Sequence, residues 1–242
     1  MKILFVNHSC FIVEFEKYVL IFDYFKTPRQ KDDSFKLSNY LDSEKKIIVF
    51  ASHGHEDHYS DTILSWDNGK RDISYVLSDD IVVGQKKSNY YIIKENKVIN
   101  VDGIEIHSFG SSDLGVSFLI DIENKSIFHA GDLNWWHWEE ETKDEQKYAE
   151  DTFKGIMDNI IDYVKKNKVT IDCAFFPVDI RLENAKFWGG EYFVKNISPK
   201  VLIPMHCWGK FLLTDEFSKY IQNLNLPTKG IIINHNLEEI YL

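Results

Sequence analysis

The 242-residue sequence has only three cysteines, Cys10, Cys173 and Cys207, which are far apart and form no CxxC pair. An odd number of scattered cysteines argues against a disulfide framework and is typical of a reducing compartment. No apolar run approaches the roughly 20 residues of a membrane-spanning helix. The apolar start is interrupted by Asn7 and His8 and lacks a small-residue cleavage site, so it predicts a strand and not a signal peptide. We therefore expect a cytoplasmic protein with no membrane partner.

Positive charge is also scarce, because 28 lysines and arginines stand against 38 acidic residues, a formal net charge of −10. Such a chain repels nucleic acid phosphates, so nucleic acid is not an expected partner. The sequence has neither the GxSxG motif of serine hydrolases nor a GxxxxGK[ST] phosphate loop. It has no low-complexity tract or long linker, and its 44% apolar content is ample for one domain spanning residues 1–242.

Short β-branched and aromatic runs separated by polar turns predict strands in the first half of the chain. These runs cover residues 2–7, 10–16, 18–25, 47–52, 73–77, 90–93, 97–101, 104–109, 115–121 and 125–130. Thr142 and Glu145 then form a capping box before an amphipathic helix at residues 143–167. Further helices are expected around 190–196 and near 217–224, with strands at 171–176, 200–205 and 230–233. This order predicts an α/β (α+β) fold of sheets covered by helices.

The segment FASHGHEDHYS concentrates metal-binding groups directly after a strand that reads as buried on both faces. His53 and His55 are separated by one residue, and Asp57 and His58 follow at once. On a tight turn relaxed by Gly54, this spacing can aim two imidazoles at one ion and the next pair at a neighbouring position. Imidazole and carboxylate ligands suit zinc, manganese or iron. The alternative, a solvated polar loop, does not explain the position directly after a buried strand.

With this motif the chain resembles the metallo-β-lactamase fold superfamily, whose HxHxDH signature follows an apolar strand. Three further segments fit the order of the family's motifs: IFDYF with Asp23, IFHAGD with Asp132 and VLIPMHCWG with His206. The segments NHSCFIVE and FFPVDIRL resemble the branch of predicted zinc-dependent hydrolases that includes ascorbate-6-phosphate lactonase. The resemblance implies a four-layer αββα sandwich with the metals at one edge, between the two sheets.

The resemblance also implies six metal ligands shared between two sets. They are His53 and His55 in the first set, Asp57, His58 and His206 in the second, and Asp132 as a bridge between both. The expected cofactor is zinc, one or two ions per chain, with manganese or iron as alternatives.

One ligand of the first set is missing from the sequence. The family usually supplies a third histidine shortly before the strand that here reads GVSFLID, and the corresponding stretch SFGSSDLG has none. His107 lies a few residues earlier, but alternation in IEIHSF places it beside Glu105, which fits a solvent-facing histidine at least as well as a ligand. Water or a carboxylate can also fill such a gap, and Ser111, Ser112 and Asp113 are nearby. The number of ions therefore stays open.

Five residues are candidates for a supporting or substrate-binding role: Asp23, His8, His107, Trp135 and Arg181. Asp23 is expected to accept a hydrogen bond from a ligand histidine, and His8 either reaches the site or is an ordinary turn residue. Trp135 lies in NWWHW, which forms either an aromatic pocket wall or a hydrophobic cap. Arg181 binds a carboxylate or phosphate of the substrate or makes a structural salt bridge. The aromatic surface is compatible with a homo-oligomer.

The chemistry expected from these residues is hydrolysis by a metal-bound hydroxide, with Asp57 orienting it or shuttling its proton. The expected partner is a small, anionic ester, lactone or phosphodiester substrate. Two alternatives remain: a metal-stabilised binding module without catalysis, and a nuclease of the same superfamily. The nuclease is less compatible with the acidic charge and with the ordinary elements between Asp132 and His206.

Overall fold

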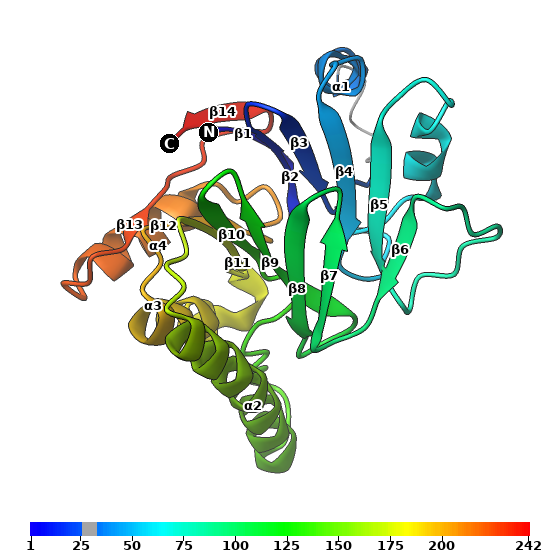
Figure 1. Ribbon diagram of the computed structural model, residues 1–242. Helices are drawn as coiled ribbons and strands as arrows, with labels where there is room; N and C mark the ends of the chain where they lie inside the picture. The colour runs from blue at the N-terminus through cyan, green and yellow to red at the C-terminus, as the bar shows by residue number, and fades with distance from the viewer. Residues whose placement is uncertain (26–32) are drawn as a thin grey trace.

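The computed structural model describes residues 1–25 and 33–242 of the protein and contains two seven-stranded sheets packed face to face (Figure 1). In spatial order, the first sheet consists of β14 (Glu238–Tyr241), β1 (Lys2–Asn7), β2 (Cys10–Glu14), β3 (Tyr18–Phe22), β4 (Lys46–Ala51), β5 (Ile73–Ser78) and β6 (Tyr90–Ile93). The second consists of β13 (Lys229–Gly230), β12 (Val201–Met205), β11 (Cys173–Pro177), β10 (Lys125–His129), β9 (Val116–Ile122), β8 (Ile104–Gly110) and β7 (Lys97–Val101).

Helices cover the outer face of each sheet, which confirms the expected αββα sandwich (Figure 1). The first sheet carries α1 (Asp33–Leu41) and the 3₁₀ helix η1 (Asp61–Trp66). The second sheet carries α2 (Lys143–Asn167), α3 (Trp188–Ile197) and α4 (Leu212–Gln222), with the 3₁₀ helix η2 (Ile180–Ala185) before α3. The capping box at Thr142 starts α2 at the predicted residue.

The two sheets share a strand pattern that determines where functional side chains collect. Strands β3 to β6 run parallel in the first sheet, and β10 to β13 run parallel in the second. The remaining pairs in both sheets are antiparallel. Because parallel strands end at the same edge, residues that follow them lie close together there.

Aromatic and aliphatic side chains from alternate strand positions fill the space between the sheets. Phe11 of β2 contacts Phe175 of β11 with ring centroids 4.2 Å apart, and Phe22 stacks on Phe50 at 4.8 Å. Each such fully buried ring contributes roughly 1.5–3 kcal/mol of transfer free energy. A second apolar cluster lies on the other face of the first sheet, under α1 and η1. This packing holds the strand ends in fixed relative positions.

The C-terminal region differs from the prediction. The strand expected at 230–233 is only the two-residue β13, and the chain continues to β14, which pairs with β1 at the sheet edge. Because β14 is a short edge strand with half of its residues exposed, it lacks a clear apolar run. The helices α1, η1 and η2 were not predicted either. In the described part of the chain, no helix combines the length and apolar character needed to cross a membrane.

Candidate metal centre

The histidines and aspartates identified in the sequence follow strand ends and gather at one edge between the sheets. The turn after β1 supplies His8, the loop after β4 supplies the HGHEDH segment, and the ends of β10 and β12 lead to Asp132 and His206. Their donor atoms form two groups, each with all atoms within 4.8 Å of one another. The groups are His8, Asp57, His58 and His206, and His53, His55 and Asp132.

Three of these strand ends turn through left-handed backbone conformations. His8, Asp23 and His206 have φ angles of 44°, 45° and 63°. Each such conformation costs a non-glycine residue roughly 1–2 kcal/mol. The His206 backbone N–H donates a 3.2 Å hydrogen bond to the His8 carbonyl, which fixes these two turns to each other across the sheets. These strained backbone turns direct the side chains of His8, Asp23 and His206 into the space between the sheets.

Asp132 lies between the two groups and presents one carboxylate oxygen to each. Its Oδ2 is 3.6 Å from Nε2 of His53. Its Oδ1 is 3.0 Å from Nε2 of His58 and 3.5 Å from Nε2 of His206. Two donors bound to one tetrahedral ion at about 2.1 Å lie about 3.4 Å apart, so these spacings fit ligands that share an ion.

Asp57 connects His8 to the second group. Its Oδ2 is 3.3 Å from Nε2 of His8, 3.9 Å from Nε2 of His206 and 4.0 Å from Nε2 of His58. Of the two roles considered for His8, turn residue or member of the site, the geometry favours the second. The second group thus offers three imidazoles and one carboxylate before Asp132 is counted.

Several of these donor atoms are buried without a hydrogen-bond partner among the described residues. They are Nε2 of His8, His53, His58 and His206, and Oδ1 of Asp132. Leaving a buried polar atom unsatisfied costs roughly 1–3 kcal/mol. A divalent ion coordinated by these atoms removes that cost, and the imidazole and carboxylate donors suit zinc, manganese or iron. The residues present therefore fit a metal.

Carboxylate and hydroxyl groups hold the other face of the histidine rings. Asp23, at the end of β3, accepts hydrogen bonds from Nδ1 of His58 at 2.8 Å and from the Ser52 backbone and hydroxyl at 2.7 Å each. Since the Ser52 hydroxyl donates to Asp23, it accepts from Nδ1 of His53 at 3.0 Å. Both rings then keep the lone pair on Nε2 for a metal, the usual arrangement behind metal-binding histidines.

Asp179 does the same for His206, and the sequence reasoning missed this role. Asp179 follows β11 and accepts a 2.9 Å hydrogen bond from Nδ1 of His206. It also accepts from Nε of Arg181 at 3.0 Å and from Nε1 of Trp208 at 3.3 Å. The available signal was a carboxylate just after a buried strand, as at Asp23.

The proximity of these groups shifts their pKa values in opposite directions. Burial lowers the pKa of His58, but the Asp132 and Asp23 carboxylates outweigh burial and raise it to about 10. Burial, with repulsion from neighbouring histidines, lowers the pKa of His8 and His53 to about 4. Burial alone would raise the pKa of Asp132, yet the surrounding histidines hold it below its usual value. Without a metal, the two carboxylates therefore favour the protonated form of His58, and a cation bound there would displace that proton.

His107 lies apart from both groups. Its Nε2 is 2.7 Å from Oε1 of Glu105 and 2.9 Å from the Tyr163 hydroxyl of α2. It shares the predicted face of β8 with Glu105, but the expectation that it faces solvent is wrong, because α2 covers that face and only 6% of His107 is exposed. His129 is packed too, since it stacks on Phe22 at 4.9 Å and donates from Nε2 to the Ser9 carbonyl.

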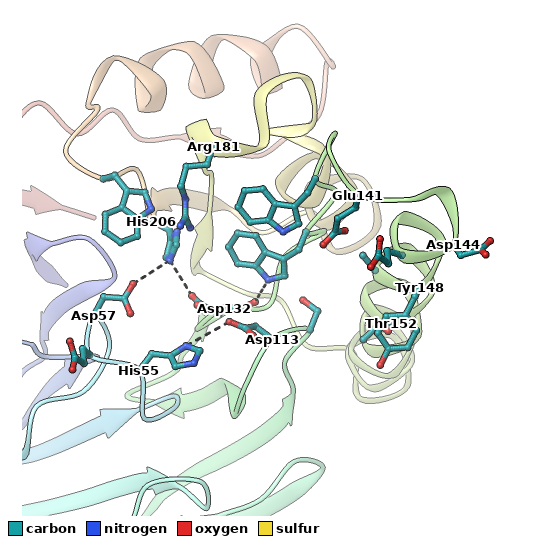
Figure 2. Close-up of a pocket in the computed structure, with 17 residues that line it drawn as sticks. His55, Asp57, Asp113, Asp132, Glu141, Asp144, Tyr148, Thr152, Arg181 and His206 are labelled. Atoms are coloured by element: carbon teal, nitrogen blue, oxygen red, sulfur yellow. Dashed lines mark hydrogen bonds and ion pairs between the residues drawn. The ribbon is translucent and has the colours of Figure 1, made fainter.

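A cavity of about 960 Å³ opens beside the metal-binding groups (Figure 2). Trp136 and Trp138, stacked with centroids 6.1 Å apart, line it, and Nε1 of Trp136 donates to the Asp132 carbonyl. Trp135 is not among the described residues that line it: its ring packs on Phe153 and lies under the Lys154 ammonium at 4.6 Å. Trp136 and Trp138, and not the candidate Trp135, therefore form the aromatic wall of the cavity, because the Trp135 ring faces α2.

Arg181 lines the same cavity above the metal-binding groups (Figure 2). Its guanidinium lies over the rings of Trp208 at 4.8 Å and Trp138 at 5.5 Å, and it pairs with Asp179. The opposite wall is formed by Glu141, two residues before α2, and by Asp144 and Tyr148 at the beginning of α2 (Figure 2). The structural salt bridge considered for Arg181 is present and leaves the guanidinium at the cavity surface, while substrate binding by Arg181 stays a prediction.

Comparison with known proteins gives matches in sequence and in structure. Residues 2–149 match the family described as the beta-lactamase superfamily domain. A protein named as a metal-dependent hydrolase from Methanosarcina barkeri is 30% identical over 154 residues, which is 54% of this chain and 61% of that protein. The matched region therefore spans less than two thirds of this curated relative.

Two solved structures share the fold over the whole chain. A metallo hydrolase from Ignicoccus hospitalis superposes with a TM-score of 0.66 and 15% identity, covering 99% of this chain and 97% of that one. A diiron β-hydroxylase from Streptomyces venezuelae has a TM-score of 0.61 and 11% identity, covering 100% of this chain and 54% of that one. At such low identity these similarities establish the fold and not the reaction.

Proposed function

The chain belongs to the family of the beta-lactamase superfamily domain, and from this premise we propose that it is a metal-dependent hydrolase of a small molecule. The reacting group is an ester, lactone or phosphodiester. The single observation that carries the proposal is the geometry of Asp132, one oxygen of which faces the buried Nε2 of His53 and the other the buried Nε2 atoms of His58 and His206, none of which has another hydrogen-bond partner among the described residues. Proteins named as metal-dependent hydrolases among its relatives add support.

A divalent ion bound at these residues would make hydroxide available at neutral pH, since coordination to a metal lowers the pKa of water from about 15.7 to about 7. His53 in the first group, and His58 and His206 in the second, would hold such ions through Nε2, because their Nδ1 atoms are fixed by Ser52, Asp23 and Asp179. Zinc is the proposed ion on the donor chemistry, with manganese and iron as alternatives.

Asp57 is the residue proposed to act on the attacking water. It lines the cavity, and its side chain is 28% exposed, so substrate and water reach it. Burial would raise its pKa, but the His8 imidazole 3.3 Å away and the charge of His58 hold the pKa below its usual value. An ionised carboxylate in this position orients water by accepting a hydrogen bond and takes a proton only transiently.

The charge on the cavity walls supports a particular orientation of the substrate. Arg181 is the cationic side chain among the described residues that line the cavity, and it lies near His206 (Figure 2). Glu141, Asp144 and Glu145 line the far wall. With metal bound to the carboxylates at the other end, an anionic or carbonyl oxygen would therefore be stabilised there beside Arg181 and repelled at the far wall. The cavity volume and its tryptophan walls suit a small substrate with an apolar body.

The test begins with protein purified without a histidine tag, stripped of metal and reloaded with zinc, manganese or ferrous iron. Chromogenic esters, lactones and phosphodiesters are then assayed. We expect turnover of at least one class that requires metal, and loss of both metal retention and turnover in Asp132→Ala and His58→Ala. Asp144→Ala, a cavity carboxylate on α2, is the matched control for metal retention.

Full activity in the metal-free protein or in Asp132→Ala would overturn the proposal. Metal retention without turnover of any class would replace it with the metal-stabilised binding module.

A further inference from the structure

The first metal-binding group has fewer donors than the second. His53, His55 and Asp132 form it, whereas the second has His8, Asp57, His58 and His206 with Asp132 shared between them. His107, the histidine nearest in sequence to the gap, is held by Glu105 and Tyr163 in another part of the fold. A donor to complete the first group must come from a different residue.

Asp113 is the described carboxylate that faces this gap. Its Oδ2 is 3.7 Å from Nδ1 of His55, and the two side chains point toward each other in the cavity (Figure 2). This separation is close to the 3.6 Å between His53 and Asp132 and to the roughly 3.4 Å expected of two ligands on one tetrahedral ion. Both side chains are about half exposed, at 46% for Asp113 and 48% for His55, so both have room to rotate toward an ion between them.

The loop that carries Asp113 is fixed to the metal-binding edge on both sides. The Val116 backbone N–H donates to the Ser52 carbonyl at 2.9 Å, directly before His53. The Ser112 hydroxyl donates to the Asn134 carbonyl at 2.6 Å and accepts from the Asn134 N–H at 2.9 Å, two residues after Asp132. The backbone on both sides of Asp113 is thus held beside two members of the first group.

We propose that Asp113 is the remaining protein ligand of the first group, a carboxylate where the family resemblance implies a histidine. The inference rests on the proposed function, because it requires that the edge bind metal. The first site then has two imidazoles and two carboxylates, and the second has three imidazoles and two carboxylates when Asp132 is counted in both. Carboxylate ligands suit manganese better than imidazole ligands do. The first site, with fewer imidazoles, should therefore bind zinc more weakly than the second site does and should accept harder ions such as manganese.

The experiment measures bound metal per chain after equilibrium dialysis against a range of free zinc or manganese, with no substrate present. We expect two zinc ions per wild-type chain, filling in two steps. Asp113→Asn, which keeps the shape of the side chain, should lower the affinity of the weaker step at least about hundredfold and leave the tighter step unchanged. Asp113→His should keep two steps and increase the zinc-to-manganese affinity ratio of the weaker one.

Asp144→Ala is the matched control, because Asp144 lines the same cavity from α2 and should leave both steps unchanged. Thermal melting of each variant establishes that it is folded. An unchanged weaker step in Asp113→Asn would overturn the inference. One ion in both wild type and Asp113→Asn would overturn it too while leaving the hydrolase proposal to stand on the second group. No bound metal in the wild type would overturn both.

Discussion

Replacing Gly115 by any other residue is predicted to destabilise the protein for two reasons, one in the backbone conformation and one in steric contact. Its φ of +73° lies in the left-handed region, and a Cβ built on it would be 2.0 Å from the Ser52 carbonyl oxygen and 2.6 Å from Cβ of His53. Gly103, in the turn between β7 and β8, has a φ of +88° but nothing within 4 Å of such a Cβ. The two glycines therefore share the backbone cost and differ in the steric cost.

The expected magnitudes follow from this difference. Gly103→Ala should lower the free energy of unfolding by about 1–2 kcal/mol, the cost of a left-handed non-glycine residue. Gly115→Ala carries the same cost and adds overpacking against backbone that cannot rotate away, about 1–3 kcal/mol more. Because the loop must move away from Ser52, Gly115→Ala should also weaken metal binding at the first group, whereas Gly103→Ala should not.

Urea unfolding of both variants in metal-free buffer measures the difference in their free energies of unfolding. Metal content after dialysis measures the effect of each substitution on metal binding at the first group. Equal free energies of unfolding for the two variants would refute the reasoning that Gly115 is needed for close approach. A destabilised Gly115→Ala that binds both ions normally would refute the claim that this contact positions the first group.

Two further predictions concern the metal-binding histidines. Asp179→Asn weakens the support of His206, so metal affinity there should fall about 10–100-fold with unchanged stoichiometry; unchanged affinity in competition with a chelator would contradict this. Without metal, His58 has a pKa of about 10, while His8 and His53 are neutral above about pH 4. At pH 7 metal binding should therefore release about one proton from these imidazoles. Metal affinity should accordingly rise about tenfold per pH unit between pH 6 and 8. Calorimetry in buffers of different ionisation enthalpy measures the protons released, and a heat independent of buffer would show that none are.

Apolar runs bounded by polar turns predicted sheets covered by helices and the places where the strands end, whereas the four-layer αββα sandwich was implied by the family resemblance. It did not predict which tryptophan faces the cavity. Residues 134–140 form neither helix nor strand in the structure, so no periodicity distinguishes Trp135 from Trp136.

The roles of His8 and Asp179 depend on contacts between distant parts of the chain. His8 reaches the second group because its turn is hydrogen-bonded to His206, and Asp179 supports His206 from the adjacent parallel strand. Neither contact has a local signature, since each follows from how the sheets pack. The exposure of His107 was mispredicted for the same reason: alternation gives the face of a strand, and only the fold shows that α2 covers it.

The hydrogen bond between His206 and the His8 carbonyl has a consequence for the chain during its synthesis. The donors of the first group, with Asp113, all lie between positions 53 and 132, while the second group needs positions 8 and 206 together. Folding that follows translation from the N-terminus can therefore offer an ion the first group well before the second exists. If the second group binds metal more tightly than the first, the site that forms earliest in a nascent chain is the weaker of the two. An ion captured at that site can still exchange with ions in solution after the chain leaves the ribosome.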